Sequence, residues 1–202
     1  SYIKVLKKSS QQFLNSTLIK DDLKKADFEK ININKYEQQD LKPSSVFILI
    51  FETIKGNEIL LLKRSNNLEL HKGEICFPGG SFEMSDQHLL NTAYREAEEE
   101  TGIKKNDIEL KFSLKEEITR TRFSIKPFVG VIKKEVSINL DNNEVDSYFK
   151  MPLSATRNEN NIRNYCFINH ENKLTYKPAF FYNGNLIWGA TANIITELLV
   201  KI

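Results

Sequence analysis

The sequence has little of what typifies a secreted, membrane or nucleic-acid-binding protein. It contains only two cysteines, Cys76 and Cys166, which lie far apart and form neither a CxxC pair nor a disulfide framework. This spacing favours reduced thiols in a cytoplasmic protein. The longest apolar run, residues 46–51, is far too short to cross a bilayer. The net charge of +2 supplies no strong field for nucleic acid or for an acidic membrane, so neither is expected as a partner.

The chain does contain enough apolar residues, 40% of 202, to build one sizeable core. Residues 1–42 are polar and rich in Lys, Gln and Asn, with apolar residues at roughly helical spacing, which predicts an N-terminal helical arm. The turn-forming residues Lys42-Pro43-Ser44-Ser45 mark the end of this arm, so residues 43–202 are expected to form the main domain.

Apolar runs and alternating patterns predict most of the regular structure of that domain. Strands are expected over segments 46–51, 58–64, 74–77, 108–114, 123–132, 148–153 and 163–168. One helix is expected from a cap at Asp86 to about Thr101, where Gly102 ends it, and another over residues 188–202. Strands around a central helix predict one α/β domain with a mixed sheet.

The predicted central helix carries four glutamates within five residues. At about 100° per residue, Glu96, Glu99 and Glu100 fall within one arc, whereas Glu98 points elsewhere; Arg95 lies at i,i+4 from Glu99. Like charges at this spacing cost roughly 0.2–0.5 kcal/mol per pair. A dication would turn the repulsion into attraction, and carboxylate oxygens suit Mg²⁺ or Mn²⁺. The alternative is that the acidic run is only a solvated helix face.

A glycine loop precedes this helix and favours the metal site over the solvated face. Gly79 and Gly80 follow a predicted strand, and glycines let a ligand approach the backbone closely. We therefore expect Gly79 to contact substrate and the Gly80 carbonyl to be a further metal ligand.

These residues resemble the Nudix hydrolase signature, which reads Gly, five residues, Glu, seven residues, then Arg-Glu-apolar-x-Glu-Glu-x-Gly-apolar. Residues 95–103 match its second half in full. In its first half the expected Gly and Glu fall on Ser81 and Gln87. This offset is similar to the coenzyme A pyrophosphatase branch, in which acidic residues follow the glycine pair at three and six positions. Gly80, Glu83 and Asp86 have that spacing here.

Two further stretches resemble the same branch. Residues 60–80, "LLLKRSNNLELHKGEICFPGG", look like its leader, although Glu69 stands where a basic residue is usual before the histidine. Residues 178–195, "PAFFYNGNLIWGATANII", are similar to its closing motif. Trp188 in that motif is expected in the core or at an interface. The likeness spans about residues 44–200.

The resemblance implies a Nudix-type α/β/α sandwich that hydrolyses a nucleoside diphosphate linked to another group. For this branch it implies that coenzyme A is split into 3′,5′-ADP and 4′-phosphopantetheine. Metal ligands would be Glu96, Glu99, Glu100 and Gly80. Arg95 would orient Glu99, and the general base is either Glu99 or Glu144.

Several assignments stay open at this level. Arg64 and His71 either bind substrate or have structural roles. The expected partner is a small nucleotide, and a homodimer is possible. The alternatives are another Nudix substrate (ADP-ribose, a dinucleotide or an oxidised nucleotide) or a non-catalytic nucleotide-binding domain.

Overall fold

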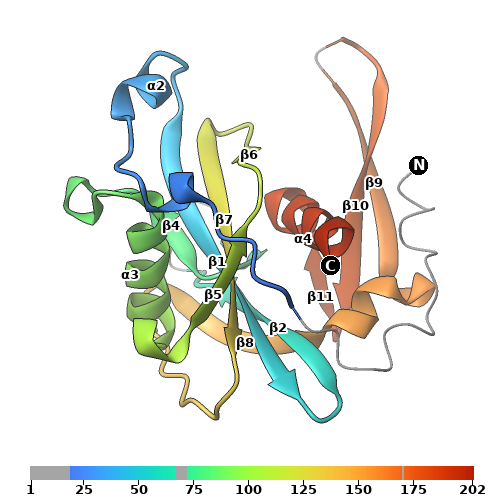
Figure 1. The fold of residues 1–202 in the computed structure, drawn as a ribbon. Helices are drawn as coiled ribbons and strands as arrows, with labels where there is room; N and C mark the ends of the chain where they lie inside the picture. Colours follow the sequence, from blue (N-terminus) through green and yellow to red (C-terminus); the bar gives the residue numbers. More distant parts are fainter. Residues whose placement is uncertain (1–18, 67–71, 170) are drawn as a thin grey trace.

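The structure, a computed structural model, describes residues 19–66, 72–169 and 171–202. Two long helices lie on opposite sides of a central sheet (Figure 1). The strands of that sheet are β1 (Lys42–Thr53), β2 (Gly56–Arg64), β3 (Ile75–Cys76), β4 (Gly79–Ser81), β5 (Glu109–Ser113), β6 (Glu117–Ile118), β7 (Phe123–Ile132) and β8 (Val145–Pro152). The helices are α3 (Leu89–Thr101) and α4 (Gly189–Lys201).

The order of the central strands is β3-β2-β1-β7-β5, with β4 paired to β1, β6 to β7 and β8 to β2. The pair β1 and β7 is parallel, whereas β1 is antiparallel to both β2 and β4. This mixture of directions matches the predicted mixed sheet.

The run of apolar residues in β1 is explained by burial on both faces. Phe47 and Leu49 belong to the core that contains Ala93 of α3. Ile48 belongs to the core that contains Ile195 of α4. Because successive side chains of a strand point to opposite faces, both faces need apolar residues. The predicted α/β/α sandwich is therefore confirmed.

The start of β1 differs from the prediction. Pro43, Ser44 and Ser45 were expected to form an irregular boundary between the arm and the domain, but they lie inside the strand. Ser44 Oγ donates to the Ser124 carbonyl at 3.2 Å and Ser45 Oγ to the Lys126 carbonyl at 3.0 Å. Pairing with β7 and β4 therefore overrides the local turn signal, and the hydroxyls of these buried serines are satisfied.

A second sheet contains β9 (Ile162–Ile168), β10 (Leu174–Tyr182) and β11 (Asn185–Ile187), of which the last two were not predicted. Phe180 and Ile187 are fully buried against α4. Trp188 is 44% exposed and meets Tyr165 edge to face. The prediction of a core position for Trp188 is therefore wrong, and an interface position stays a prediction.

The described part of the N-terminal arm packs on the domain. It contains two short helices, η1 (Lys25–Phe28) and α2 (Ile33–Glu37). Ile19 is buried in the α4-side core, and the Asp22 N–H donates to the Lys111 carbonyl at 2.8 Å. The domain boundary between residues 42 and 43 stays a prediction.

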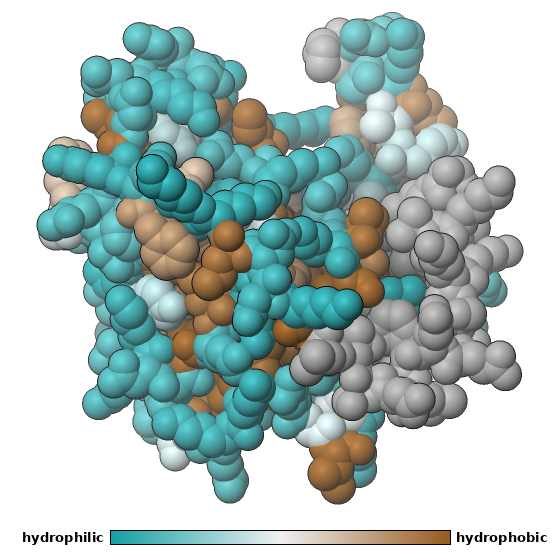
Figure 2. Space-filling model, viewed as in Figure 1, coloured by the Kyte–Doolittle hydropathy of each residue, from teal (hydrophilic) through white to brown (hydrophobic). Residues whose placement is uncertain are grey.

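The remaining elements are short, namely η2 (Met84–Asp86), η3 (Lys105–Asp107), η4 (Leu153–Arg157) and η5 (Glu159–Asn161). Cys76 and Cys166 are both free thiols, as expected. Across the described ranges, no helix is long and apolar enough to cross a membrane. The face shown in Figure 2 is mostly hydrophilic, with smaller hydrophobic areas between the polar side chains.

Candidate active site

The acidic helix α3 begins later than predicted. His88 is its N-cap, accepting at Nδ1 from the Asn91 N–H at 3.3 Å, and Gln87 has a positive φ of 66°. The prediction that Asp86 caps this helix is therefore wrong. The helix ends as expected, with Gly102 at a φ of 73° after Thr101. A left-handed residue at this position is the usual way to end a helix, and glycine adopts it without strain.

The glycine pair lies in β4 and brings the backbone against the acidic face of α3. A Cβ atom on Gly80 would overlap the Glu96 carboxylate, and one on Gly79 would overlap the Ser45 carbonyl. The Gly79 N–H donates to Glu100 Oε2 at 2.9 Å. Neither glycine has a positive φ. Both are therefore required for space, and neither adopts the positive φ that glycine alone tolerates well.

We expect Gly80→Ala to lower turnover roughly tenfold or more, because the new methyl group displaces Glu96 and small misplacements of reacting groups are costly. The fold should persist, since the backbone conformation suits alanine, and circular dichroism would check this. Ser81→Ala is the matched control, because Ser81 is exposed and contributes only its backbone carbonyl to Arg95. Unchanged turnover in Gly80→Ala would refute this close packing.

Arg95 is the centre of the charged network. Its Nε and Nη2 atoms donate to the two oxygens of Asp86 at 2.9 and 3.0 Å. Nη1 donates to Glu96 at 2.9 Å and to Glu99 at 3.1 Å. Hydrogen bonding to Asp86 is the main reason that the pKa of Arg95 is raised. The predicted pairing of Arg95 with Glu99 is confirmed, and it is one of several contacts.

Asp86 anchors this network, a role that the sequence interpretation missed. Burial raises the pKa of Asp86, but hydrogen bonds from Arg95, the Glu83 N–H and Thr92 outweigh it, so the pKa is lowered. Thr92 Oγ1 donates to Asp86 at 2.8 Å. A signal was available, because Asp86 has the position of the branch's second acidic residue and precedes the signature arginine by nine residues.

Glu100 is the buried member of the acidic set, and Glu96 is half-buried. Glu100 is 3% exposed, and burial, followed by the nearby Glu96 and Glu144 carboxylates, raises its pKa to about 8 against the Gly79 hydrogen bond. Burial also raises the pKa of Glu96, more than Arg95 lowers it. Carboxylates whose pKa is raised by burial and by neighbouring carboxylates form a site that a cation would stabilise.

We expect the metal-free protein to lose stability as pH rises from about 5 to 8, and Glu100→Gln to reduce this loss. The folded state keeps the Glu100 proton up to pH 8, whereas the unfolded chain releases it near pH 4.5. The folded state therefore binds the extra proton within this window, so stability falls as pH rises. At about 1.4 kcal/mol per pKa unit the contribution is on the order of 4 kcal/mol.

Urea unfolding at several pH values, compared between wild type and Glu100→Gln, checks this prediction. Glu98→Gln is the control, because Glu98 is exposed on the same helix. Parallel pH profiles for wild type and Glu100→Gln would contradict it.

Glu144 and Arg64 lie at the same site from other elements. The Ser65 N–H donates to the Glu144 carbonyl at 2.8 Å, and Arg64 pairs with Val145 across β2 and β8. Glu144 raises the pKa of Glu100, whereas Arg64 lowers it. Among the described residues, the buried Nε of Arg64 has no hydrogen-bond partner. One predicted base candidate and one predicted substrate contact thus adjoin the glutamates.

Cys76 also adjoins these groups, although the sequence interpretation gave it no role. Burial, reinforced by Glu100, raises the pKa of its thiol to about 12 against the effect of Arg64. At such a pKa the thiol stays protonated and unreactive at neutral pH.

The carboxylates do not form a closed metal cage in this structure. In the ranges that the structure describes, no three His, Cys, Asp or Glu side chains are grouped so that they could hold one ion. Glu99 has a 56% exposed side chain paired with Arg95, and Glu100 points to Gly79. The donor set nevertheless fits Mg²⁺ or Mn²⁺, because it offers hard oxygen ligands, and Glu96 and Glu100 among them have raised pKa values.

The other predicted site residues have different outcomes. His71 lies outside the described residues. The Gly79 N–H is donated to Glu100, and a contact with substrate stays a prediction. The backbone of Gly80 lies against Glu96, and its carbonyl as a metal ligand likewise stays a prediction. The choice between Glu99 and Glu144 as general base is not tested by this geometry.

Comparisons with known proteins agree with this geometry. The NUDIX domain family model matches residues 41–174. The uncharacterized Nudix hydrolase NudL of Citrobacter koseri is 33% identical over 148 residues, covering 71% of this chain and 74% of its own. NudL of Pectobacterium atrosepticum is 30% identical, with the same two shares.

Among solved structures, a NUDIX hydrolase from Alicyclobacillus acidocaldarius is similar in fold. Its TM-score is 0.52 at 17% identity, covering 58% of this chain and 81% of its own. The family model spans more than half of the chain, and relatives above 30% identity support it. The chain therefore belongs to the Nudix hydrolase family.

Proposed function

We propose that this protein is a Mg²⁺- or Mn²⁺-dependent hydrolase that cleaves the diphosphate linkage of coenzyme A or its derivatives, giving 3′,5′-ADP and 4′-phosphopantetheine. The substrate assignment depends on the leader and closing motifs, because the acidic signature itself recognises only a diphosphate. A cytoplasmic location is part of the same proposal.

One observation carries the proposal: of the three stretches that resemble the coenzyme A branch, the leader contacts both of the others. The N–H of Gly79, at the end of the leader beside Gly80, donates to Glu100 of the acidic signature. Thr191 Oγ1 of the closing motif donates to the Ile75 carbonyl at 3.0 Å, next to the glycine loop. Arg64 of the leader lowers the pKa of Glu100. The leader thus contacts both the acidic signature and the closing motif.

The proposed roles follow from charge and position. Glu96, Glu99 and Glu100, with the Gly80 carbonyl, would hold the metal ions, which supply charge neutralisation at the diphosphate and a more acidic bound water. Arg95 holds Glu96 and Glu99 in place and is itself held by Asp86. This is the supporting role that neighbours of metal ligands usually have.

Arg64 is suited to bind a phosphate group of the substrate. Its Nε is buried without a partner among the described residues, and guanidinium groups pair well with phosphate oxygens. Glu99 and Glu144 are the two candidates for the general base. Glu99 is held by Arg95, and Glu144 lies in the loop before β8 close to Glu100.

A panel of diphosphate substrates tests the proposal directly. Coenzyme A, ADP-ribose, a dinucleotide and an oxidised nucleoside triphosphate would be incubated with the protein and Mg²⁺, and the products separated by chromatography. We expect 3′,5′-ADP from coenzyme A at a kcat/KM at least tenfold above the others. Preferred cleavage of another member would overturn the substrate assignment. Binding to coenzyme A without products would favour a non-catalytic domain.

A further inference from the structure

A cluster of aromatic side chains lies where the β9–β10 hairpin meets the turn between β6 and β7. Tyr165 and Phe167 of β9 have ring centres 6.0 Å apart, and Tyr165 meets Trp188 edge to face at 5.8 Å. The guanidinium carbon of Arg120, in the turn, lies 4.2 Å from the centre of the Phe167 ring. In Figure 1 the hairpin extends beyond α4 at the same end of the domain as β6. None of these residues belongs to the acidic site.

The aromatic cluster is only partly covered by the rest of the chain. Trp188 is 44% exposed although it meets Tyr165, whereas Tyr165 and Phe167 are half-buried. Arg120 already lies over the ring of Phe167. The indole of Trp188 is therefore the most open ring of the cluster. An open aromatic ring beside cations suits a nucleobase, because every base has a flat face that can stack on it.

Two cations border the cluster without a carboxylate partner. Lys177 of β10 lies opposite Tyr165 in the antiparallel pair, and directly paired residues share one face of a sheet. Arg120 is exposed to solvent. Within the described chain, neither Arg120 nor Lys177 forms an ion pair. An anionic ligand group can therefore pair with both side chains without displacing a carboxylate.

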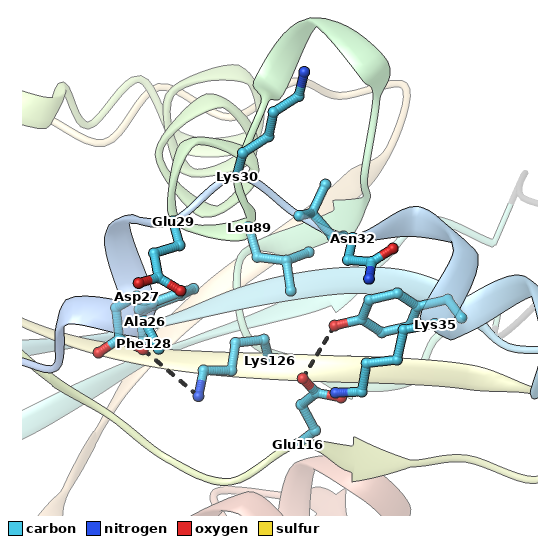
Figure 3. Close-up of a pocket in the computed structure, with 12 residues that line it drawn as sticks. Ala26, Asp27, Glu29, Lys30, Asn32, Lys35, Leu89, Glu116, Lys126 and Phe128 are labelled. Carbon is cyan, nitrogen blue, oxygen red and sulfur yellow. Dashed lines mark hydrogen bonds and ion pairs between the residues drawn. The ribbon is translucent and has the colours of Figure 1, made fainter.

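The carboxylates at β6 have donors of their own. Burial raises the pKa of Tyr165, and the nearby Glu117 adds to this against the effect of Arg120. Glu117 accepts from Asn193 Nδ2 at 2.7 Å. Glu116 accepts from the Tyr36 hydroxyl at 3.0 Å, and Figure 3 shows this bond under the N-terminal arm. Two cations thus face one carboxylate that already accepts a hydrogen bond, which favours an anionic ligand.

The aromatic cluster and the acidic site are connected by the segment 75–80. Thr191 Oγ1, in the first turn of α4 after Trp188, donates to the Ile75 carbonyl at 3.0 Å. Four residues after Ile75, the Gly79 N–H donates to Glu100. Four residues of fully extended chain span at most about 14 Å. The two sites are therefore neighbours, which suits separate parts of one substrate.

We propose that Trp188 stacks on the adenine base of the substrate and that Arg120 and Lys177 bind the phosphate on its ribose 3′ position. The inference rests on the proposed function for the identity of the substrate. Coenzyme A carries this 3′-phosphate, whereas ADP-ribose and dephospho-coenzyme A do not. Cationic side chains are strong partners of phosphate oxygens. The cluster thereby supplies a specificity that the acidic signature, which recognises only the diphosphate, does not have.

Fluorescence titration tests this site directly, because Trp188 is the only tryptophan in the sequence. The probes are adenosine 3′,5′-bisphosphate, adenosine 5′-monophosphate and inorganic phosphate, in EDTA. We expect the bisphosphate to quench the fluorescence and to bind at least about fivefold more tightly than the monophosphate, and inorganic phosphate to have no effect. Equal affinity for the two nucleotides would overturn the 3′-phosphate contact. No quenching by either would overturn the base contact.

Substitutions separate the two contacts. Lys177→Gln should weaken binding of the bisphosphate about fivefold and leave that of the monophosphate unchanged, a difference that misfolding would not produce. Trp188→Leu should weaken both nucleotides about tenfold by calorimetry. Lys55→Gln, in the turn between β1 and β2, is the matched control and should bind like wild type. Wild-type affinity in Lys177→Gln or in Trp188→Leu would contradict the proposal.

Steady-state kinetics distinguish this inference from the proposed reaction. With coenzyme A, Lys177→Gln should raise KM about fivefold at unchanged kcat, because the 3′-phosphate is remote from the reacting bond. With dephospho-coenzyme A it should change neither constant. Cleavage of coenzyme A with the same KM in both proteins would overturn the 3′-phosphate site alone. Quenching of Trp188 by the bisphosphate without any cleavage of coenzyme A would overturn the reaction and support the site.

Discussion

Glu99→Gln is expected to lower turnover by roughly 10²-fold or more while leaving the melting temperature of the metal-free protein unchanged. The Glu99 side chain is 56% exposed and contacts Arg95 alone among the residues of its helix, so the fold does not depend on its charge. Its loss would remove either a metal ligand or the general base, and both are needed only for the reaction. Steady-state kinetics with saturating substrate and Mg²⁺ would measure the effect.

Glu98→Gln is the matched control for this substitution. It makes the same chemical change one residue earlier on the helix, where Glu98 is exposed and outside the Arg95 network. We expect its turnover to stay within about twofold of the wild type. Near-normal turnover in Glu99→Gln would refute the metal-site assignment, whereas equal losses in both variants would point to a general effect of helix charge.

Removal of divalent cations should abolish turnover altogether, and added Mg²⁺ or Mn²⁺ should restore it. Without a cation, burial, together with neighbouring carboxylates, raises the pKa values of Glu96 and Glu100. The diphosphate would add further negative charge to this place. A rate measured in excess EDTA that equals the rate in Mg²⁺ would count decisively against a metal-dependent reaction.

Thermal melting supplies a second measurement for the same prediction. A cation that binds only the folded state raises the melting temperature with its concentration. We expect this increase in wild type and its loss in Glu96→Gln. Glu52→Gln, at the exposed end of β1, is a control that should respond like wild type. An identical response in all three proteins would place cation binding elsewhere.

The parts of the fold that were predicted correctly are those with strong local patterns. The apolar run 46–51 and the alternating segment 123–132 are strands because their side chains are buried on one or both faces. The missed parts depend on distant partners. Ser44 extends β1 only because β7 and β4 pair with it, and β10 becomes a strand beside β9.

The residues of the candidate site also divide into those that a local pattern places and those that distant contacts place. Glu96, Glu99 and Glu100 could be placed on one helix face because helical periodicity fixes their relation to Arg95. The spacing of Asp86 marked it as a residue of interest, but its contact with Arg95 could not be placed, since the chain turns before α3 at a positive φ of Gln87. Likewise, no local pattern shows that Glu144 and Arg64 approach Glu100, because strand pairing brings them there.

The parallel pairing of β1 with β7 has a consequence for folding kinetics. Ser44 and Ser124 meet although they lie 80 positions apart, and the glycine pair and α3 both lie within the loop of chain that this pairing closes. Closing so long a loop costs entropy before contacts repay it, and such topologies fold slowly. A growing polypeptide that ends before Phe123 therefore carries every signature residue and still lacks the scaffold that gathers them.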